Sequence, residues 1–168
     1  MKKVFISVFF LVSFTVSAFQ NEPDGFRGVK WGASITKIGK EFSFHKKISD
    51  SEIVYIKNTD SLKIGDAKLT NVTYSFLDQR FVMAMVTAKK LEKDNLVASL
   101  TYNFGNPYYT DKNNTWVWNG KTTSILLTCE KISLYCYLEF YSGKILNKMM
   151  SEHSTKLQNQ AIDSMNDF

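Results

Sequence analysis

Few residues of this chain are of the types that carry out chemistry. Two histidines, His45 and His153, and two cysteines, Cys129 and Cys136, occur among the 168 residues. Zinc takes four ligands and favours these residue types, so a zinc site is not expected. The short motifs of dinucleotide, phosphate, metalloprotease and serine-hydrolase sites are absent. No local pattern selects a catalytic triad or a carboxylate pair, so we expect no catalytic residue, no metal and no cofactor.

The first 18 residues have the composition of an export signal. Lys2 and Lys3 precede an apolar run from Val4 to Val16, and Val16-Ser17-Ala18 offers small residues at the cleavage positions. A membrane anchor is the alternative, but about 20 apolar residues are needed to span a bilayer. We expect cleavage after Ala18, no stable membrane insertion afterwards, and a periplasmic or extracellular chain.

Removal of this signal lowers the positive charge of the chain. Without Lys2 and Lys3 the formal net charge falls from +5 to +3. Such a small excess does not indicate nucleic-acid binding, which is usually accompanied by a dense basic patch. A mild attraction to anionic envelope surfaces and an ordinary solvated basic surface both remain open.

Cys129 and Cys136 become interpretable in an exported chain. An even pair of cysteines in an oxidising compartment predicts a disulfide. A redox-active pair is the alternative, but both cysteines fall on predicted strands. We therefore expect a structural bond, and closing so short a loop stabilises by about 2–3 kcal/mol.

Hydrophobic periodicity predicts the order helix, three strands, helix, three strands, helix. Ser34 caps a first helix of two turns that includes Ile35, Ile38 and Phe42. Asp94 begins a second helix that ends at Gly105, before Pro107. The predicted buried residues of this second helix are Leu96, Val97, Leu100 and Phe104. Strands are predicted over 52–58, 68–77 and 80–89, and in the hairpins around 116–141.

Three predicted hairpins fix a register. A two-residue turn at Asp78-Gln79 pairs Phe76 with Phe81, Tyr74 with Met83, and Val72 with Met85, all on one apolar face. A turn at Asn119-Gly120 pairs Trp118 with Lys121 and Trp116 with Thr123. A turn at Ile132-Ser133 places Cys129 opposite Cys136, on the same face as the two tryptophans.

These patterns predict an α+β fold with a mainly antiparallel sheet, built from two pseudo-repeated halves of one helix and three strands. The helices are expected to pack on the apolar face of the sheet. The chain divides into a signal peptide (1–18), a linker (19–25), an α+β domain (26–142), and a C-terminal helix and tail (143–168). This last helix is a candidate for packing on the body, for homodimer formation, or for fraying.

The sheet face opposite the cysteines holds the candidate binding residues. It carries Tyr135, Tyr137 and Tyr141, with Val117 and Leu126 on neighbouring strands. Tyrosine offers a large contact area with a hydrogen-bonding tip, so three on one face favour recognition. The alternative is that the N-terminal segment or a helix covers them. Trp31, between Gly28 and Gly32, is expected to anchor the core, with a groove lining as the alternative.

Four segments of the chain resemble a group of small exported bacterial proteins with an FRGxxWG-like opening motif. They are Phe26-Arg27-Gly28-Val29-Lys30-Trp31-Gly32, residues 63–69, Tyr74-Ser75-Phe76 and Phe104-Gly105-Asn106-Pro107. The resemblance covers about residues 26–141 and implies no catalytic residue. The layout is loosely similar to β-lactamase-inhibitor-protein-like and outer-membrane-assembly modules, an analogy of fold alone.

Together these features predict a non-catalytic protein that binds another envelope or secreted protein. An inhibitor, an immunity-type protein and an envelope assembly module all fit. The alternative is an envelope hydrolase or a small-ligand-binding protein whose site has no sequence motif. As an enzyme it should depend on His45 or on a carboxylate.

The expected processing is directly testable. Mass spectrometry of the chain recovered by secretion should find Phe19 as the first residue, because signal peptidase cuts after the small residue Ala18. Cys129 and Cys136 should resist a thiol-alkylating reagent until they are reduced. A chain that keeps residues 1–18 and stays in the membrane fraction would contradict the export signal.

Overall fold

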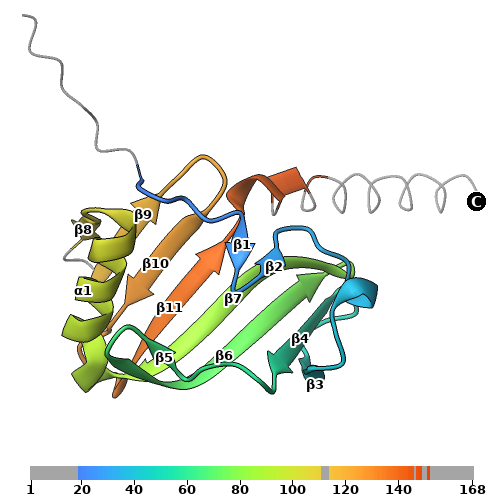
Figure 1. Ribbon diagram of the computed structural model, residues 1–168, viewed down its shortest axis with the longest axis horizontal. Coiled ribbons are helices and arrows are strands. Elements are labelled where there is room, and N and C mark those ends of the chain that lie inside the picture. Colours follow the sequence, from blue (N-terminus) through green and yellow to red (C-terminus); the bar gives the residue numbers. More distant parts are fainter. Residues whose placement is uncertain (1–18, 111–113, 146, 149–150, 152–168) are drawn as a thin grey trace, which may run out of the picture.

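A nine-stranded antiparallel sheet dominates the computed structural model, which describes residues 19–110, 114–145, 147, 148 and 151 (Figure 1). Its strands lie in the order β3-β4-β6-β7-β11-β10-β9-β8, and β5 pairs with β6 beside this path. A helix of 12 residues lies against the sheet, together with a small separate hairpin made of β1 and β2. The mixed α+β class with a mainly antiparallel sheet is therefore confirmed.

The elements have the following bounds. The strands are β1 (Gly25–Phe26), β2 (Val29–Lys30), β3 (Phe42–Lys47), β4 (Glu52–Lys57), β5 (Lys63–Ile64), β6 (Ala67–Leu77), β7 (Arg80–Lys89), β8 (Tyr108–Thr110), β9 (Thr115–Asn119), β10 (Ser124–Thr128) and β11 (Tyr135–Tyr141). The helical elements are the 3-10 turns η1 (Ile35–Lys37) and η2 (Lys90–Glu92) and the helix α1 (Lys93–Phe104).

Helix α1 covers one end of the sheet, close to the predicted position. Its residues Leu96 and Leu100 are fully buried, and Val97 and Phe104 pack at the edge of the core. The helix ends at Gly105, whose φ of 84° lies where a side chain would be strained. The Trp118 indole donates a 2.8 Å hydrogen bond to the Gly105 carbonyl and so ties β9 to this end of the helix.

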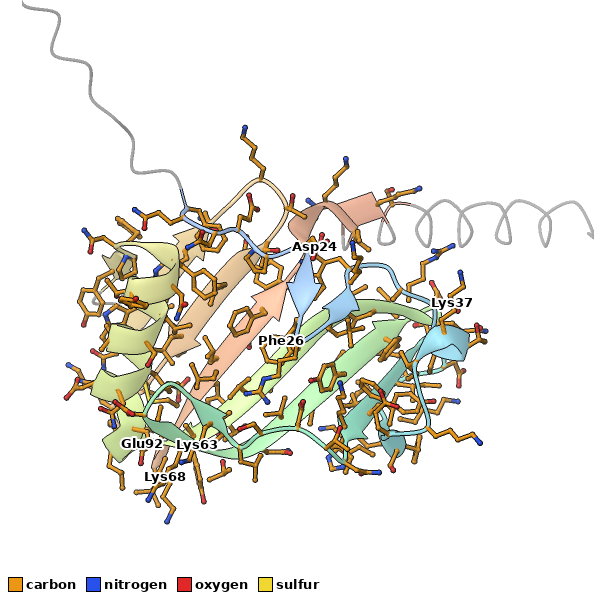
Figure 2. All side chains as sticks on the ribbon, viewed as in Figure 1. Asp24, Phe26, Lys37, Lys63, Lys68 and Glu92 are labelled. Atoms are coloured by element: carbon orange, nitrogen blue, oxygen red, sulfur yellow. A yellow bond between two sulfur atoms is a disulfide. The ribbon has the colours of Figure 1, made fainter. Side chains whose placement is uncertain are left out.

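The N-terminal segment 19–32 covers the middle of the same face, as Figures 1 and 2 show. Phe19 stacks on Phe104 with ring centroids 5.4 Å apart. Phe26 lies 4.8 Å from the Phe140 ring, and Trp31 lies 4.9 Å from the Phe81 ring. We call this segment the strap. The anchoring role predicted for Trp31 agrees with its position, because its side chain is buried in the core.

A buried charge network fixes the strap hairpin on the sheet. Arg27 and Gly28 form the two-residue turn between β1 and β2, both with positive φ. The Arg27 guanidinium lies 3.5 Å from the Asp60 carboxylate, which accepts a 2.6 Å hydrogen bond from the Tyr74 hydroxyl. Burial, and then the hydrogen bond to Asp60, raise the pKa of the Tyr74 hydroxyl far above its usual range. The hydroxyl therefore stays a donor.

The first predicted helix is wrong beyond its first turn. Ser34 caps η1 as predicted, but Ile38 is already extended and Phe42 begins β3. The Ile35 N–H bonds to the Gln79 carbonyl, which draws this segment along the start of β7. The Phe42 ring then packs edge-on against Tyr74 at 5.1 Å, so its apolar character serves a strand.

The predicted register of β6 and β7 is correct at the turn and wrong beyond it. Phe76 pairs with Phe81, but Ser75 pairs with Met83 and leaves Val82 as a bulge. The Phe81 carbonyl accepts a hydrogen bond from the N–H of Gly32, the last residue of the strap, and the Phe81 N–H donates to the carbonyl of the next residue, Ala33. These bonds hold the Phe81 ring in the core, stacked on Trp31. Met83 and Met85 consequently lie opposite Ser75 and Thr73 rather than Tyr74 and Val72.

The predicted Asn119-Gly120 turn is a longer loop, so its register is also wrong. Trp118 pairs with Ile125 and Trp116 with Leu127, although each pair shares the face that was predicted. The strap contacts this longer loop. The Glu22 carboxylate accepts hydrogen bonds from the Thr122 and Thr123 N–H groups, and the Trp31 indole donates to the Thr123 hydroxyl at 2.7 Å.

Other predictions have mixed outcomes. The pseudo-repeat is not confirmed, because η1 is a single 3-10 turn and β3 and β8 extend both halves of the sheet. The signal peptide and most of the C-terminal segment lie outside the described residues, so both stay predictions. Within the described residues, no helix has the length and apolar character needed to cross a membrane.

The buried network should stabilise the fold measurably. We expect Tyr74→Phe to lower the free energy of unfolding by about 2 kcal/mol, because it removes a hydrogen bond from a buried carboxylate. Tyr55→Phe is the matched control, since that ring packs against Phe76 on the same face and its loss of a hydroxyl spares Asp60. Urea unfolding measures both variants. Equal stability of the two would contradict a stabilising role for the Tyr74–Asp60 bond.

Candidate interaction surface

The five residues predicted for binding lie on one face of the sheet, opposite the strap and α1. Val117 pairs with Leu126, and Leu126 pairs with Glu139, which lies between Tyr137 and Tyr141 on β11. Tyr135 and Tyr137 are 39% and 38% exposed, and the others are partly buried by their neighbours. We call this the Tyr face. The structure therefore brings the five residues together.

The described covering elements all lie on the other face. Phe26, Trp31, Leu96 and Leu100 belong to one buried cluster with Leu138 and Phe140, whose side chains point away from the tyrosines. After β11 the chain turns to the same side, since a Cβ at Gly32 would lie 3.2 Å from the Ile145 Cδ1. The sequence left two alternatives for the tyrosines, recognition of a partner or cover by another part of the chain. Cover by the strap or by α1 is excluded.

Two methionines extend the Tyr face, and sequence reasoning missed them. Met83 pairs with Tyr141, and Met85 pairs with Glu139, on the strand next to β11. Both reach this face only because the Val82 bulge reverses the alternation of β7. Methionine side chains are flexible and polarisable, which suits a surface that must adapt to a partner.

Glu139 lies in the middle of these apolar side chains. It was not among the five residues predicted for binding. Its cross-strand neighbours are Leu126 on β10 and Met85 on β7. The side chain is half-buried, and its carboxylate has no hydrogen bond or ion pair within the described part of the chain. Burial raises the pKa of this carboxyl above its usual range. The Glu139 carboxylate is therefore partly shielded from water, and no described residue forms a hydrogen bond or ion pair with it.

The predicted disulfide holds the end of the Tyr face. Cys129 and Cys136 are bonded, with their Cα atoms 4.3 Å apart, at the base of the turn between β10 and β11. Both cysteines are buried on the core face. The predicted register around Ile132-Ser133 is confirmed along the whole of β10, from Ser124–Tyr141 to Thr128–Tyr137.

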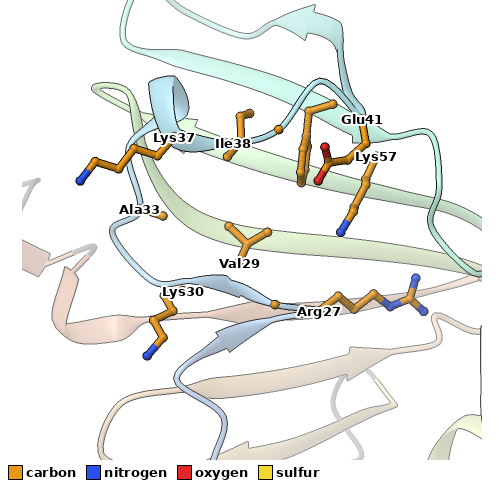
Figure 3. Close-up of a pocket in the computed structure, with 11 residues that line it drawn as sticks. Arg27, Val29, Lys30, Ala33, Lys37, Ile38, Glu41 and Lys57 are labelled. Atoms are coloured by element: carbon orange, nitrogen blue, oxygen red, sulfur yellow. The ribbon is translucent and has the colours of Figure 1, made fainter.

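A separate cavity of about 430 Å³ opens beside the strap (Figure 3). Its lining combines the apolar residues Val29, Ala33, Ile38 and Phe42 with four basic residues and Glu41. The basic residues are Arg27, Lys30, Lys37 and Lys57.

Two of the four basic residues of this cavity already have partners within the chain. Arg27 donates to the Ser61 and Lys63 carbonyls, and Lys30 pairs with Asp24 at 3.0 Å. In Figure 3 the Lys37 side chain extends away from the cavity, whereas Glu41 and Lys57 turn toward the same part of it. Their opposite charges leave little net field for an anion. This cavity is the place for the small-ligand alternative.

The structure offers little support for catalysis by His45. The side chain is exposed on β3 at the edge of the sheet, where the pairing with β4 is irregular. Within residues 19–110 and 114–145 no three His, Cys, Asp or Glu side chains gather into a metal-binding group. His153 lies outside the described residues.

The position of Glu139 predicts a stability effect with a definite sign. Since the pKa of its carboxyl is higher in the folded than in the unfolded chain, ionisation disfavours folding as pH rises through these values. We expect Glu139→Gln to raise the free energy of unfolding at pH 7 by about 0.5 kcal/mol, and to change it little below pH 4. Glu130→Gln, in an exposed turn, is the control. Lower stability of Glu139→Gln at pH 7 would contradict this account.

Comparisons of the chain with protein-family models, with curated proteins and with solved structures found no match. No known activity, ligand or partner therefore transfers to this chain, and its own side chains must carry the functional proposal.

Proposed function

We propose that this chain is an exported, non-catalytic recognition protein that binds another envelope or secreted protein through the Tyr face. Glu139, which no described element covers and which lies among tyrosine and methionine side chains, is the observation that carries the proposal. An inhibitor, an immunity-type protein or an envelope assembly module would each use such a surface. The disulfide agrees with folding in an oxidising compartment.

The composition of the Tyr face suits a protein partner. Tyrosine and methionine are enriched in the centres of protein interfaces, where they bury a large area while one end can still form hydrogen bonds. The rim of this face is polar, with Thr87 and Thr128 flanking Tyr137. Apolar contact area bordered by polar side chains is the usual organisation of an interface between proteins that also exist apart.

Glu139 defines the chemistry of the partner. A half-buried carboxylate without a counter-ion is best satisfied by a basic side chain, which would recover the interaction that the carboxylate lost with water. Arginine fits best, because its planar guanidinium can pair with the carboxylate and stack on neighbouring tyrosine rings. The partner should therefore place an arginine or lysine at the centre of its contact with Leu126, Glu139 and Met85.

Affinity capture with matched variants tests this proposal. The exported chain serves as bait in an envelope and secreted-protein extract from its source, and the captured protein is purified for calorimetry. Glu139→Gln should weaken binding about tenfold or more, since a hydrogen-bonded charge contributes about 1.5–3 kcal/mol. The double variant Tyr135→Ser/Tyr137→Ser should abolish capture. Tyr102→Ser is the control, because Tyr102 is exposed on α1 and lies away from the Tyr face.

Folding and binding can be separated in this experiment. Glu139→Gln should be at least as stable as the unchanged chain, so its loss of binding cannot reflect unfolding. Thermal unfolding monitored by circular dichroism checks each bait. If Glu139→Gln and the tyrosine variant bind as well as Tyr102→Ser, the Tyr face is not the binding surface. A screen of small ligands against the cavity near Glu41 and Lys57 then becomes the next experiment.

A further inference from the structure

Three strongly exposed aliphatic side chains lie on adjoining segments at one end of the sheet, outside the Tyr face. Ile132 and Leu134, in the turn between β10 and β11, are 94% and 79% exposed, and Leu91 of η2 is 75% exposed. The Lys90 N–H donates a 2.9 Å hydrogen bond to the Leu134 carbonyl, so η2 lies directly against this turn. We call these three residues the aliphatic tip. Large aliphatic side chains exposed close together are unfavourable in water, and such patches usually mark a site of interaction.

The aliphatic tip is held in place by its own contacts. The Lys90 ammonium donates 2.8 Å hydrogen bonds to the Glu130 and Lys131 carbonyls, which closes the turn from one side. The Ser133 hydroxyl accepts a 3.0 Å hydrogen bond from the Tyr135 N–H, and the disulfide closes the base of the turn. The aliphatic side chains are thus presented by a turn that is already ordered, which lowers the entropy lost on binding.

Basic residues surround the aliphatic tip. Lys89 ends β7 opposite Tyr135, and Lys131 precedes Ile132. Neither lysine forms an ion pair with any residue that the structure describes. The Glu92 carboxylate instead turns inward and accepts hydrogen bonds from the Lys68 N–H and the Asn95 amide. Figure 2 shows Glu92 and Lys68 together at this end of the molecule. Glu130 and Asp94 are the nearby exposed acids, and Asp94 pairs with Lys93 at 3.2 Å.

From these observations we propose that the aliphatic tip docks on the surface of a bilayer that contains anionic lipids. Ile132, Leu134 and Leu91 would enter the boundary between headgroups and acyl chains, while Lys89 and Lys131 stay at the level of the headgroup phosphates. The tip is aliphatic and strongly exposed. The strongest residues of protein interfaces are instead Trp, Tyr and Arg, with Leu under-represented. This proposal does not depend on the partner proposed for the Tyr face, because the aliphatic tip and the Tyr face consist of different side chains.

Vesicle flotation tests the proposal with matched variants. The exported chain, with its disulfide intact and the same N-terminus in every variant, is mixed with vesicles of phosphatidylcholine, with or without phosphatidylglycerol. We expect it to float with the anionic vesicles and to bind the neutral vesicles much more weakly. The double variant Ile132→Ser/Leu134→Ser should reduce the partition coefficient at least about tenfold. Lys131→Gln should reduce it about fivefold.

Ile48→Ser provides the control. Ile48 is an exposed aliphatic residue in the β3–β4 turn, next to Lys47, at the far edge of the sheet. This variant should bind anionic vesicles as the unchanged chain does. Because all the substituted side chains are exposed, each variant should keep its thermal unfolding temperature, which circular dichroism checks.

Several results would overturn the proposal. They are no flotation of the unchanged chain, equal binding to neutral vesicles, and an equal loss in Ile48→Ser. If the tip variant keeps its vesicle binding but loses the protein captured by the unchanged chain, the aliphatic tip is a protein contact instead. Loss of vesicle binding with unchanged protein capture would support the lipid surface and leave the Tyr face proposal standing.

Discussion

The elements that cover the wide sheet within the described residues all lie on one of its faces, and much of the architecture follows from this constraint. Helix α1 and the strap bury Leu138, Phe140 and the disulfide on one side. Within the described residues the other side has no second layer, so its side chains must tolerate water while still packing along the strands. Tyrosine, threonine and methionine meet that requirement, because each combines an apolar body with a polar or polarisable atom. The same composition makes this face suitable for a partner.

The strap covers the sheet and also contacts it at the two places where the strand register differs from the prediction. Its backbone bonds to Phe81 accompany the bulge that sends Met83 and Met85 to the Tyr face. Its Glu22 carboxylate fills the loop after β9. The charge network of Arg27, Asp60 and Tyr74 then fixes the strap hairpin over the neighbouring strands. The predicted linker (19–25) and the residues that follow it therefore contact both the loop after β9 and the start of β7.

Local sequence was sufficient where a local signal was strong. The apolar stripe of α1 with its final Gly105, and the turn at Ile132-Ser133 set by the two cysteines, appeared as predicted. Distant contacts decided the rest. The loop after Asn119 depends on Glu22, about a hundred residues earlier in the chain, and the Val82 bulge depends on Gly32 and Ala33. No pattern around either site announces these partners. The Tyr face was thus predicted through its tyrosines, while Met83, Met85 and the half-buried state of the Glu139 carboxylate required the structure.

The central pairing of β7 with β11 joins strands from opposite halves of the chain. The pairing of β7 with β11 can form only after β11 has been synthesised. The same holds for the packing of Phe26 against Phe140. Folding therefore depends on contacts of large sequence separation, which form slowly. Phe19 and Glu22 gain their partners Phe104 and Thr123 only late in synthesis. This delay leaves the first described residues undocked while most of the chain is made, which suits the export proposed above.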